Sequence, residues 1–299
     1  MDTLRSICEA EGPRTGKELH TKTHMDLFQL WKACFTCDDL ISKEAGCRYL
    51  RFDKQVAGYA RLSPSIGRAF YSYTVFGTSE QLDAVRNRAD KISREAAEVS
   101  RSKAKLAREV ISAVVSRHHA ASNVSEHACF LLSGDIAYGM AHREPRPEPS
   151  TDKLVNGSDL DIVVVHDGLS SDEILSLDRL IYDQKNRLLR DPALREEIDY
   201  VIKDLARAKE QLGFADFESM VASKVLHEGL FLYGSTTLYE QVKAEVSRTG
   251  IPERLDVLRQ RAAAERKDAR RDLLASDGAI HDESIMQLFY TTDEREEFF

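Results

Sequence analysis

The chain has 299 residues, of which 42% are hydrophobic and 31% charged, and its formal net charge is −8. This length exceeds that of a minimal domain and the composition is that of a folded protein, so wholesale disorder is excluded. The negative charge opposes long-range attraction to nucleic acid, and any polynucleotide contact would need a local basic surface.

The sequence contains no apolar run of the roughly 18 residues that a membrane-spanning helix needs, and its first residues lack an apolar signal core. Its five cysteines follow no disulfide framework spacing, which is typical of reduced thiols. We therefore expect a cytoplasmic protein that has no membrane partner.

The first 78 residues give a mixed pattern, in which the aromatic-rich run at 69–77 could form a strand. Apolar residues three or four apart then predict one long helix, or two in line, over 79–119. Either Thr78 or Ser79 can cap its start. This helix and a second run at 259–271 are rich in Arg and Lys, which suits either a phosphate backbone or a solvated helix face with interleaved carboxylates.

A second group of residues has metal-ligand chemistry. Cys34 and Cys37 have zinc-knuckle spacing, Cys47 follows, and His20 and His24 would share one face of a helix. The alternative is that Cys34 is a small buried residue of an amphipathic helix over 26–40.

Short apolar runs at 127–134 and 159–168 predict two strands, and 198–202 predicts a third. Pro145, Pro147 and Pro149 predict an exposed loop between the first two strands. A helix capped by Ser170 or Ser171 follows the second strand, helices fill most of 203–275, and the acidic end is expected to be a loose tail.

Alternate side chains of a strand share a face, so Asp159 and Asp161 should project together while Leu160 and Ile162 pack behind them. Asp199 adds a third carboxylate if its strand is a neighbour. Adjacent carboxylates repel each other unless a cation lies between them, which predicts a site for Mg²⁺ or Mn²⁺.

The glycine-containing turn from Gly134 to Gly139 could hold a phosphate, because backbone N–H groups can approach an anion where side chains are missing. An aspartate at position 135 is unfavourable there unless it helps to hold a metal ion. The alternative is an ordinary strand-to-helix turn.

Three runs, LLSGDIAYG at 131–139, GSDLDIVVV at 157–165 and EEIDYVI at 196–202, together resemble the DNA polymerase β-like nucleotidyltransferase superfamily, in particular its minimal bacterial members. KVLHEGLFLYGS at 224–235 is similar to the segment that often follows their catalytic core. The resemblance covers about residues 125–240. Two features depart from it: Asp135 replaces the usual serine, and the gap from Gly134 to Asp159 is long.

The resemblance implies an α/β (α+β) protein with a small mixed-sheet nucleotidyltransferase core at 125–240. The helical patterns outside this core predict a mostly helical region at 1–124 and a helical region with an acidic tail at 241–299. The resemblance also implies a set of site residues. Asp159, Asp161 and Asp199 would hold the metal and act in catalysis, while Gly134, Asp135, Gly139 and Ser158 would border the nucleoside triphosphate.

The implied reaction moves a nucleoside monophosphate from the triphosphate to an acceptor hydroxyl and releases pyrophosphate. Family members modify RNA, proteins or small molecules, and some serve in bacterial toxin and defence systems. The basic helices favour RNA such as tRNA as the acceptor. A second hypothesis keeps the fold but not the activity, as a nucleotide-binding or partner-binding regulator.

Overall fold

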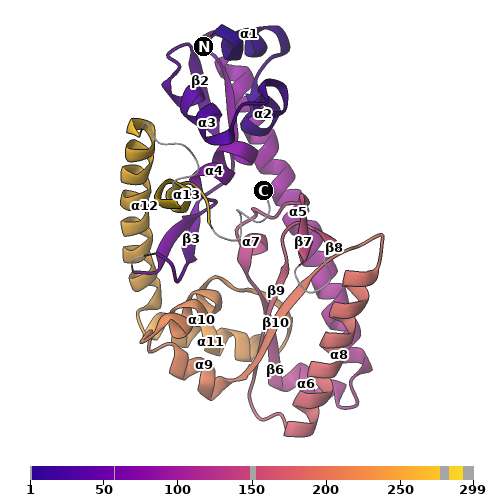
Figure 1. Ribbon diagram of the computed structural model, residues 1–299. Helices are drawn as coiled ribbons and strands as arrows, with labels where there is room; N and C mark the ends of the chain where they lie inside the picture. The colour runs from indigo at the N-terminus through magenta and orange to yellow at the C-terminus, as the bar shows by residue number, and fades with distance from the viewer. Residues whose placement is uncertain (1, 57, 149–152, 277–282, 292–299) are drawn as a thin grey trace. The chain divides into compact units, whose positions relative to one another are not determined.

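The computed structural model describes the chain except residues 1, 57, 149–152, 277–282 and 292–299 (Figure 1). It combines helices with several small sheets, as the sequence predicted. Two compact units are present: unit 1 comprises 1–95 with 258–299, and unit 2 comprises 96–257. The boundaries lie within helices α5 (Leu82–Arg117) and α12 (Ile251–Ala275), so they differ from the three consecutive segments expected from the sequence.

Unit 2 is built on a four-stranded mixed sheet with the order β10-β9-β6-β11. Its strands are β6 (Ala128–Leu132), β9 (Leu160–His166), β10 (Ile198–Asp204) and β11 (Leu230–Gly234). The β9–β10 pair is parallel, and the β6–β9 and β6–β11 pairs are antiparallel. The strands predicted at 127–134, 159–168 and 198–202 are therefore confirmed.

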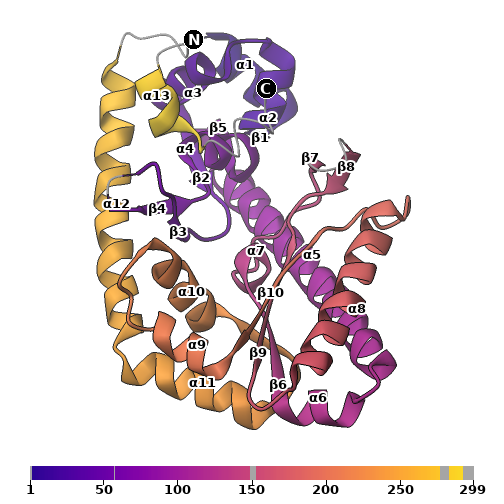
Figure 2. The same cartoon turned by 60° about the horizontal axis from the view of Figure 1, so that its bottom comes forward.

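Helices cover both faces of this sheet (Figures 1 and 2). Leu160, Ile162 and Val164 of β9 lie in a buried cluster with residues of α5 and of α8 (Ser171–Arg190). On the other face lie α9 (Leu205–Gln211) and α11 (Thr236–Arg248), which contact β6, β9 and β10, and α10 (Phe217–Glu228), which packs against α9, α11 and α7. Because side chains alternate along β9, Asp161 faces the side of α10.

Local capping explains where two long helices begin. Thr78 forms a capping box with Gln81 ahead of α5, and Ser170 forms one with Glu173 at the start of α8. In each box the hydroxyl and the side chain three residues later satisfy two backbone N–H groups. The short helices α6 (Ala121–His127) and α7 (Gly134–Ala137) flank β6.

The proline-containing segment is a β-hairpin, so the prediction of an irregular loop was wrong there. Its strands are β7 (Pro145–Glu148) and β8 (Lys153–Asn156), and they pair antiparallel. An isolated two-stranded ribbon tolerates proline because each strand has a free edge that needs no N–H donor. Pro149 lies outside the described residues.

Unit 1 contains more strand than the sequence suggested. A three-stranded sheet has the order β1-β5-β2 and β3 pairs with β4. Thr74–Thr78 is the strand expected within the aromatic-rich run. The elements of this unit are α1 (Asp2–Glu11), β1 (Arg14–Thr15), α2 (Gly16–Thr23), α3 (Leu27–Thr36), β2 (Leu40–Glu44), β3 (Tyr49–Phe52), β4 (Ala60–Ser63), α4 (Ile66–Arg68), a π-helix (Ala69–Tyr73), β5 (Thr74–Thr78), a 3₁₀ turn (Ser79–Gln81) and α13 (Glu283–Phe289).

The core of unit 1 joins the two ends of the chain. Phe28 and Trp31 of α3 each contact the Phe289 ring, with centroids 5.4 Å apart. Tyr290 is also fully buried. Within the described residues, no helix has both the length and the apolar character needed to cross a membrane.

Candidate functional site

Asp161 and Asp199 lie side by side on the sheet. Their Cα atoms are register partners in the parallel β9–β10 pair, so both side chains project from the same face. Asp161 is half-buried and Asp199 is largely exposed. The structure thus brings together two of the three predicted metal ligands.

Gly134 packs directly against Asp161. Its φ is +68°, and a Cβ atom added there would collide with Asp161 Oδ2. The Ser133 N–H donates to the Asp161 carbonyl oxygen at 2.9 Å, which fixes the turn against β9. A residue with a side chain would therefore suffer both an unfavourable backbone conformation and a direct overlap with the carboxylate.

Asp135 points inward. Ser158 Oγ donates to Asp135 Oδ2 at 2.8 Å, and the Asp135 charge contributes to raising the pKa of Asp161. The carboxylate that departs from the family pattern is thus part of the acidic group, which suits the alternative that it helps to hold a metal ion.

Glu228, at the end of α10, is a further site residue that the sequence reasoning missed. Its side chain is only 4% exposed and pairs with Lys224. It accepts hydrogen bonds from the Gly134 N–H at 3.2 Å and from the Tyr138 hydroxyl at 2.6 Å. The sequence signal was a Lys and a Glu four residues apart on a helix, immediately before a glycine and a strand.

The Gly134 N–H, which was expected to bind a phosphate, already donates a hydrogen bond within the protein. That N–H is bonded to Glu228, and the helix behind the turn, α7, has only four residues. Gly139 closes the turn with φ +68° and has open space where a Cβ would lie. The turn therefore offers Gly139, rather than Gly134, as the open position.

Burial and the neighbouring carboxylates raise the pKa of Asp161 to about 7. Burial is the largest cause, followed by the charges of Asp135, Asp199 and Glu228, whereas Lys224 acts in the opposite direction. Carboxylates this close together repel one another when all are ionised, and a bound divalent cation would remove that repulsion. The chemistry of these donors therefore fits Mg²⁺ or Mn²⁺.

Asp159, the remaining predicted ligand, lies one residue before β9 and forms an ion pair with Arg146 of the hairpin. Arg146 also pairs with Glu197 at 2.9 Å and donates from Nε to the Gly157 carbonyl at 3.0 Å. The hairpin thus holds the Asp159 carboxylate, an arrangement that the sequence did not suggest.

Asp199 is likewise paired, because Lys185 of α8 lies 2.9 Å from its Oδ1. Among the described residues, no three or more His, Cys, Asp or Glu side chains are placed as a metal-binding group. In this structure, two of the three predicted metal ligands therefore have basic side chains as counter-ions.

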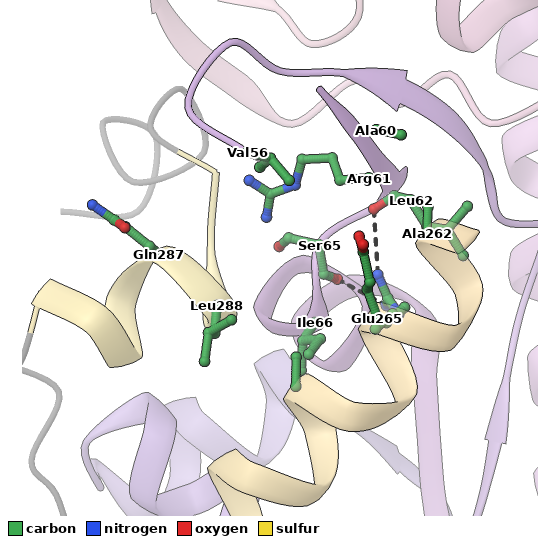
Figure 3. Close-up of a pocket in the computed structure, with 12 residues that line it drawn as sticks. Val56, Ala60, Arg61, Leu62, Ser65, Ile66, Ala262, Glu265, Gln287 and Leu288 are labelled. Carbon is green, nitrogen blue, oxygen red and sulfur yellow. Dashed lines mark hydrogen bonds between the residues drawn. The ribbon is translucent and has the colours of Figure 1, made fainter. Parts of the chain in front are cut away.

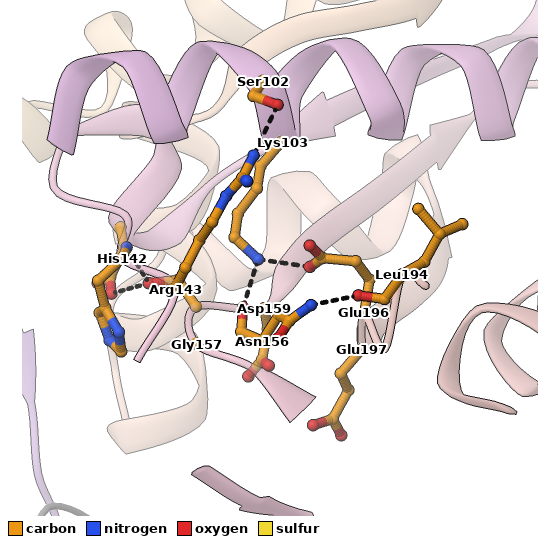
Figure 4. Close-up of polar contacts among 12 residues, drawn as sticks. Ser102, Lys103, His142, Arg143, Asn156, Gly157, Asp159, Leu194, Glu196 and Glu197 are labelled. Atoms are coloured by element: carbon orange, nitrogen blue, oxygen red, sulfur yellow. Dashed lines mark hydrogen bonds and ion pairs between the residues drawn. The ribbon is translucent and has the colours of Figure 1, made fainter. Parts of the chain in front are cut away.

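Buried contacts fix the backbone that leads into Asp159 (Figure 4). Lys103 of α5 pairs with Glu196 and donates to the Asn156 carbonyl at 2.7 Å. Burial lowers the pKa of Lys103 and raises that of Glu196. This pair anchors the base of the hairpin and the start of β10 to α5.

Ser158 and Gly157 are held by the segment after the glycine turn. The His142 N–H donates to Ser158 Oγ at 3.2 Å, and the Ser158 N–H donates to the His142 carbonyl at 3.2 Å. A Cβ at Gly157 would collide with that carbonyl. Ser158 is therefore fixed between His142 and Asp135 by direct hydrogen bonds.

The cysteines predicted as zinc ligands lie in unit 1. Cys34 and Cys37 are buried and Cys47 is exposed, and none of the three forms a disulfide. Burial is the main cause that raises the pKa of Cys34 well above its ordinary value, which opposes thiolate formation. In the described part of the chain, these cysteines form no metal-binding group with His20 or His24.

Much of the basic charge of α5 is used in the fold. Lys103 pairs with Glu196, and Lys105 lies 3.8 Å from Glu109 on the same helix. Arg88 pairs with Glu18 at 2.5 Å. These contacts favour the solvated, ion-paired interpretation of α5 over a surface that tracks a phosphate backbone.

Comparisons of the chain with protein-family models, with curated proteins and with solved structures gave no match.

Proposed function

We propose that unit 2 is a metal-dependent nucleotidyltransferase that moves a nucleoside monophosphate from a nucleoside triphosphate to an acceptor hydroxyl. The observation that carries the proposal is the convergence of Asp161, Asp199 and Asp135 beside Gly134. The resemblance of the three sequence runs to that superfamily supports it independently.

In this proposal Asp161 and Asp135 hold the cation, and Asp159 joins them when it leaves Arg146. A bound Mg²⁺ or Mn²⁺ supplies charge neutralisation for the triphosphate and for the departing pyrophosphate. Gly139 and Ser158 border the triphosphate. The donors are all hard oxygens, as these ions require.

Asp199 is the exposed member of the pair and is therefore the residue that an acceptor can reach. We assign it the removal of the acceptor hydroxyl proton. A bond then forms between the acceptor oxygen and the α-phosphorus, the bond from the α-phosphorus to its bridging oxygen breaks, and pyrophosphate leaves. Release of Asp199 from Lys185 precedes this role, because the ammonium stabilises the charged carboxylate.

The first acceptor to test is RNA, and the compartment we propose is the cytoplasm. The protein is incubated with each α-³²P-labelled nucleoside triphosphate, Mg²⁺ or Mn²⁺ and cell extract, after which RNA, protein and small molecules are separated. We expect label in one class and loss of labelling in Asp161→Asn. Asp167→Asn, an exposed aspartate just after β9, is the matched control.

A second function is favoured by the ion pairs of Asp159 with Arg146 and of Asp199 with Lys185. With these pairs retained, the unit would be a regulator that binds nucleotide without turnover. Saturable Mn²⁺ and nucleotide binding without any label transfer would select the regulator. Absence of both transfer and Mn²⁺ binding would contradict the metal site itself.

A further inference from the structure

Unit 1 contains a cavity of about 140 Å³ whose lining is mostly basic and aromatic. Four cations line this basic cleft, and among its described lining residues Glu44 is the single carboxylate: the cations are Arg48, Arg266, Lys267 and Arg270. The balance is three positive charges, in a chain whose formal net charge is −8. The cleft is therefore opposite in sign to the protein as a whole.

Three of the four cations come from the basic run at 259–271, and the structure divides that run in two. Arg261 pairs with Glu265 at 2.7 Å, and Arg271 pairs with Asp268 at 2.8 Å, so these two have carboxylate partners on α12. Three other cations of the run, Arg266, Lys267 and Arg270, line the basic cleft.

Arg270 is held in place by an aromatic ring. Its guanidinium carbon lies 4.1 Å from the centroid of Phe35, a cation–π contact that orients the planar group. Burial and then the nearby charge of Arg48 lower the pKa of Arg270. In the described part of the chain, Arg270 and Lys267 have no hydrogen-bond acceptor or carboxylate partner.

Glu44 offsets only one of the four cations of the lining, and its charge also acts on Arg270. It forms an ion pair with Arg48, whose Nε donates to Glu44 Oε1 at 2.8 Å. The buried Trp31 and Phe70 also line the cleft. Rigid aromatic side chains beside an oriented guanidinium are pre-organised to receive an anion.

A larger cavity of unit 1, about 260 Å³, lacks this character (Figure 3). Its lining is mainly apolar, and its arginines serve the fold. Arg61 pairs with Asp53 at 2.9 Å, and Arg266 donates to the carbonyls of Leu62 and Ser65. Its composition points to no particular ligand, whereas the basic cleft selects one by charge.

We propose that the basic cleft binds a terminal phosphate monoester, as found on a nucleoside monophosphate or at the 5′ end of RNA. A monoester is close to a dianion at neutral pH and brings three acceptor oxygens, which suits a lining with a surplus of three positive charges in which Lys267 and Arg270 make no hydrogen bond to the described residues. A phosphodiester of a nucleic-acid backbone carries one charge, and binding such a backbone needs an extended basic surface, whereas this cavity of about 140 Å³ is small. The inference does not depend on the proposed transfer reaction.

The test is equilibrium binding to the full chain in EDTA, which keeps divalent ions out of unit 2. Inorganic phosphate, AMP, a 5′-phosphorylated RNA oligonucleotide and the same oligonucleotide with a 5′ hydroxyl are titrated by calorimetry. We expect AMP and the 5′-phosphorylated RNA to bind, and the 5′-hydroxyl RNA to bind at least tenfold more weakly. Equal binding of the two oligonucleotides would overturn the proposal, as would absence of saturable binding by any phosphate.

The site is located by variants that remove either a positive or a negative charge from the lining. Arg270→Gln and Lys267→Gln should each weaken AMP binding about tenfold, whereas Arg271→Gln removes the same charge from the same helix and should change it less than twofold. Glu44→Gln should tighten binding several-fold, because it removes the only carboxylate of the described lining. If Arg270→Gln lowers the melting temperature, the exposed Lys267→Gln decides. If Arg271→Gln lowered the AMP affinity as much as Arg270→Gln does, or if Glu44→Gln weakened AMP binding, the basic cleft would not be the phosphate site.

Discussion

Arg146 of the hairpin forms an ion pair with Asp159, the carboxylate that the sequence assigns to the metal site. The same guanidinium pairs with Glu197, so the hairpin joins the start of β9 to the start of β10. A cation at this place competes with a metal ion for the same oxygen.

Replacing Arg146 by Ala should therefore tighten Mn²⁺ binding in the absence of nucleotide, by about tenfold or about 1.4 kcal/mol. Binding is measured by the loss of the free Mn²⁺ electron paramagnetic resonance signal. Arg143→Ala is the matched control, because Arg143 donates to Ser102 and lies just before the same hairpin. Unchanged or weaker Mn²⁺ binding in Arg146→Ala would argue against competition at Asp159.

Gly134 and Gly139 form a natural pair of test positions, since both have φ +68° and only Gly134 faces the Asp161 carboxylate. Each change to Ala should cost about 1 kcal/mol of unfolding free energy from the backbone alone. Gly134→Ala should in addition abolish Mn²⁺ binding and label transfer, while Gly139→Ala should retain Mn²⁺ binding. Equal Mn²⁺ affinities of the two variants would contradict this prediction, because they would show that a Cβ at position 134 does not disturb the Asp161 carboxylate.

Asp161→Asn separates stability from binding. In the metal-free protein Asp161 lies against three other carboxylates, so its neutral replacement should raise the melting temperature at pH 7.5. The same change should remove the stabilisation that Mg²⁺ or Mn²⁺ confers on the wild type. Differential scanning fluorimetry with and without the ions measures both effects, and a lower metal-free melting temperature would contradict the assumed repulsion.

The Lys103–Glu196 pair is nearly fully buried, with side-chain exposures of 1% and 9%. Lys103→Met leaves an unpaired buried carboxylate and should lower the free energy of unfolding by about 3–5 kcal/mol. The double variant Lys103→Met/Glu196→Leu should recover most of this loss, because no charge remains buried. Urea denaturation of the wild type, both single variants and the double variant gives the coupling free energy. Additive losses would mean that the two side chains do not act as a pair.

His166 should make the stability of the protein depend on pH. Burial lowers the pKa of His166 despite the opposing charges of Asp204 and Asp167, and its Nδ1 is buried without a partner among the described residues. Its folded pKa therefore lies below its unfolded value near 6.5, so the unfolded chain binds more protons and stability falls as the pH drops below that value. His166→Leu should show a smaller fall in melting temperature between pH 7.5 and pH 5.5 than the wild type. An equal fall would assign the acid sensitivity to other groups.

The sequence predicted the elements whose side chains repeat with a regular period. Strands β6 and β9 are short apolar runs and helix α5 has an apolar repeat, and residues of all three elements are buried in one cluster. The alternation along β9 also predicted that Asp161 faces away from Leu160 and Ile162. These features are determined by residues close together in the sequence, so they can be predicted without knowledge of the tertiary structure.

The hairpin and the counter-ions could not be predicted in the same way. Prolines at 145 and 147 suggested a loop, because the two-stranded pairing that tolerates them is set by contacts distant in sequence. Arg146, Lys185 and Glu228 carry no periodic signal, and their roles appear only when the sheet places them beside the aspartates. The function assigned to this group of residues stays a prediction.

The division of the chain has a consequence for its synthesis. The buried aromatic residues Phe289 and Tyr290 belong to the same core as Phe28 and Trp31, so unit 1 cannot complete its interior until translation has nearly reached residue 291. All of unit 2 has been synthesised before then. In this order of synthesis, the carboxylate site of unit 2 can fold first. The core formed by residues 1–95 is completed only after α13 has been synthesised.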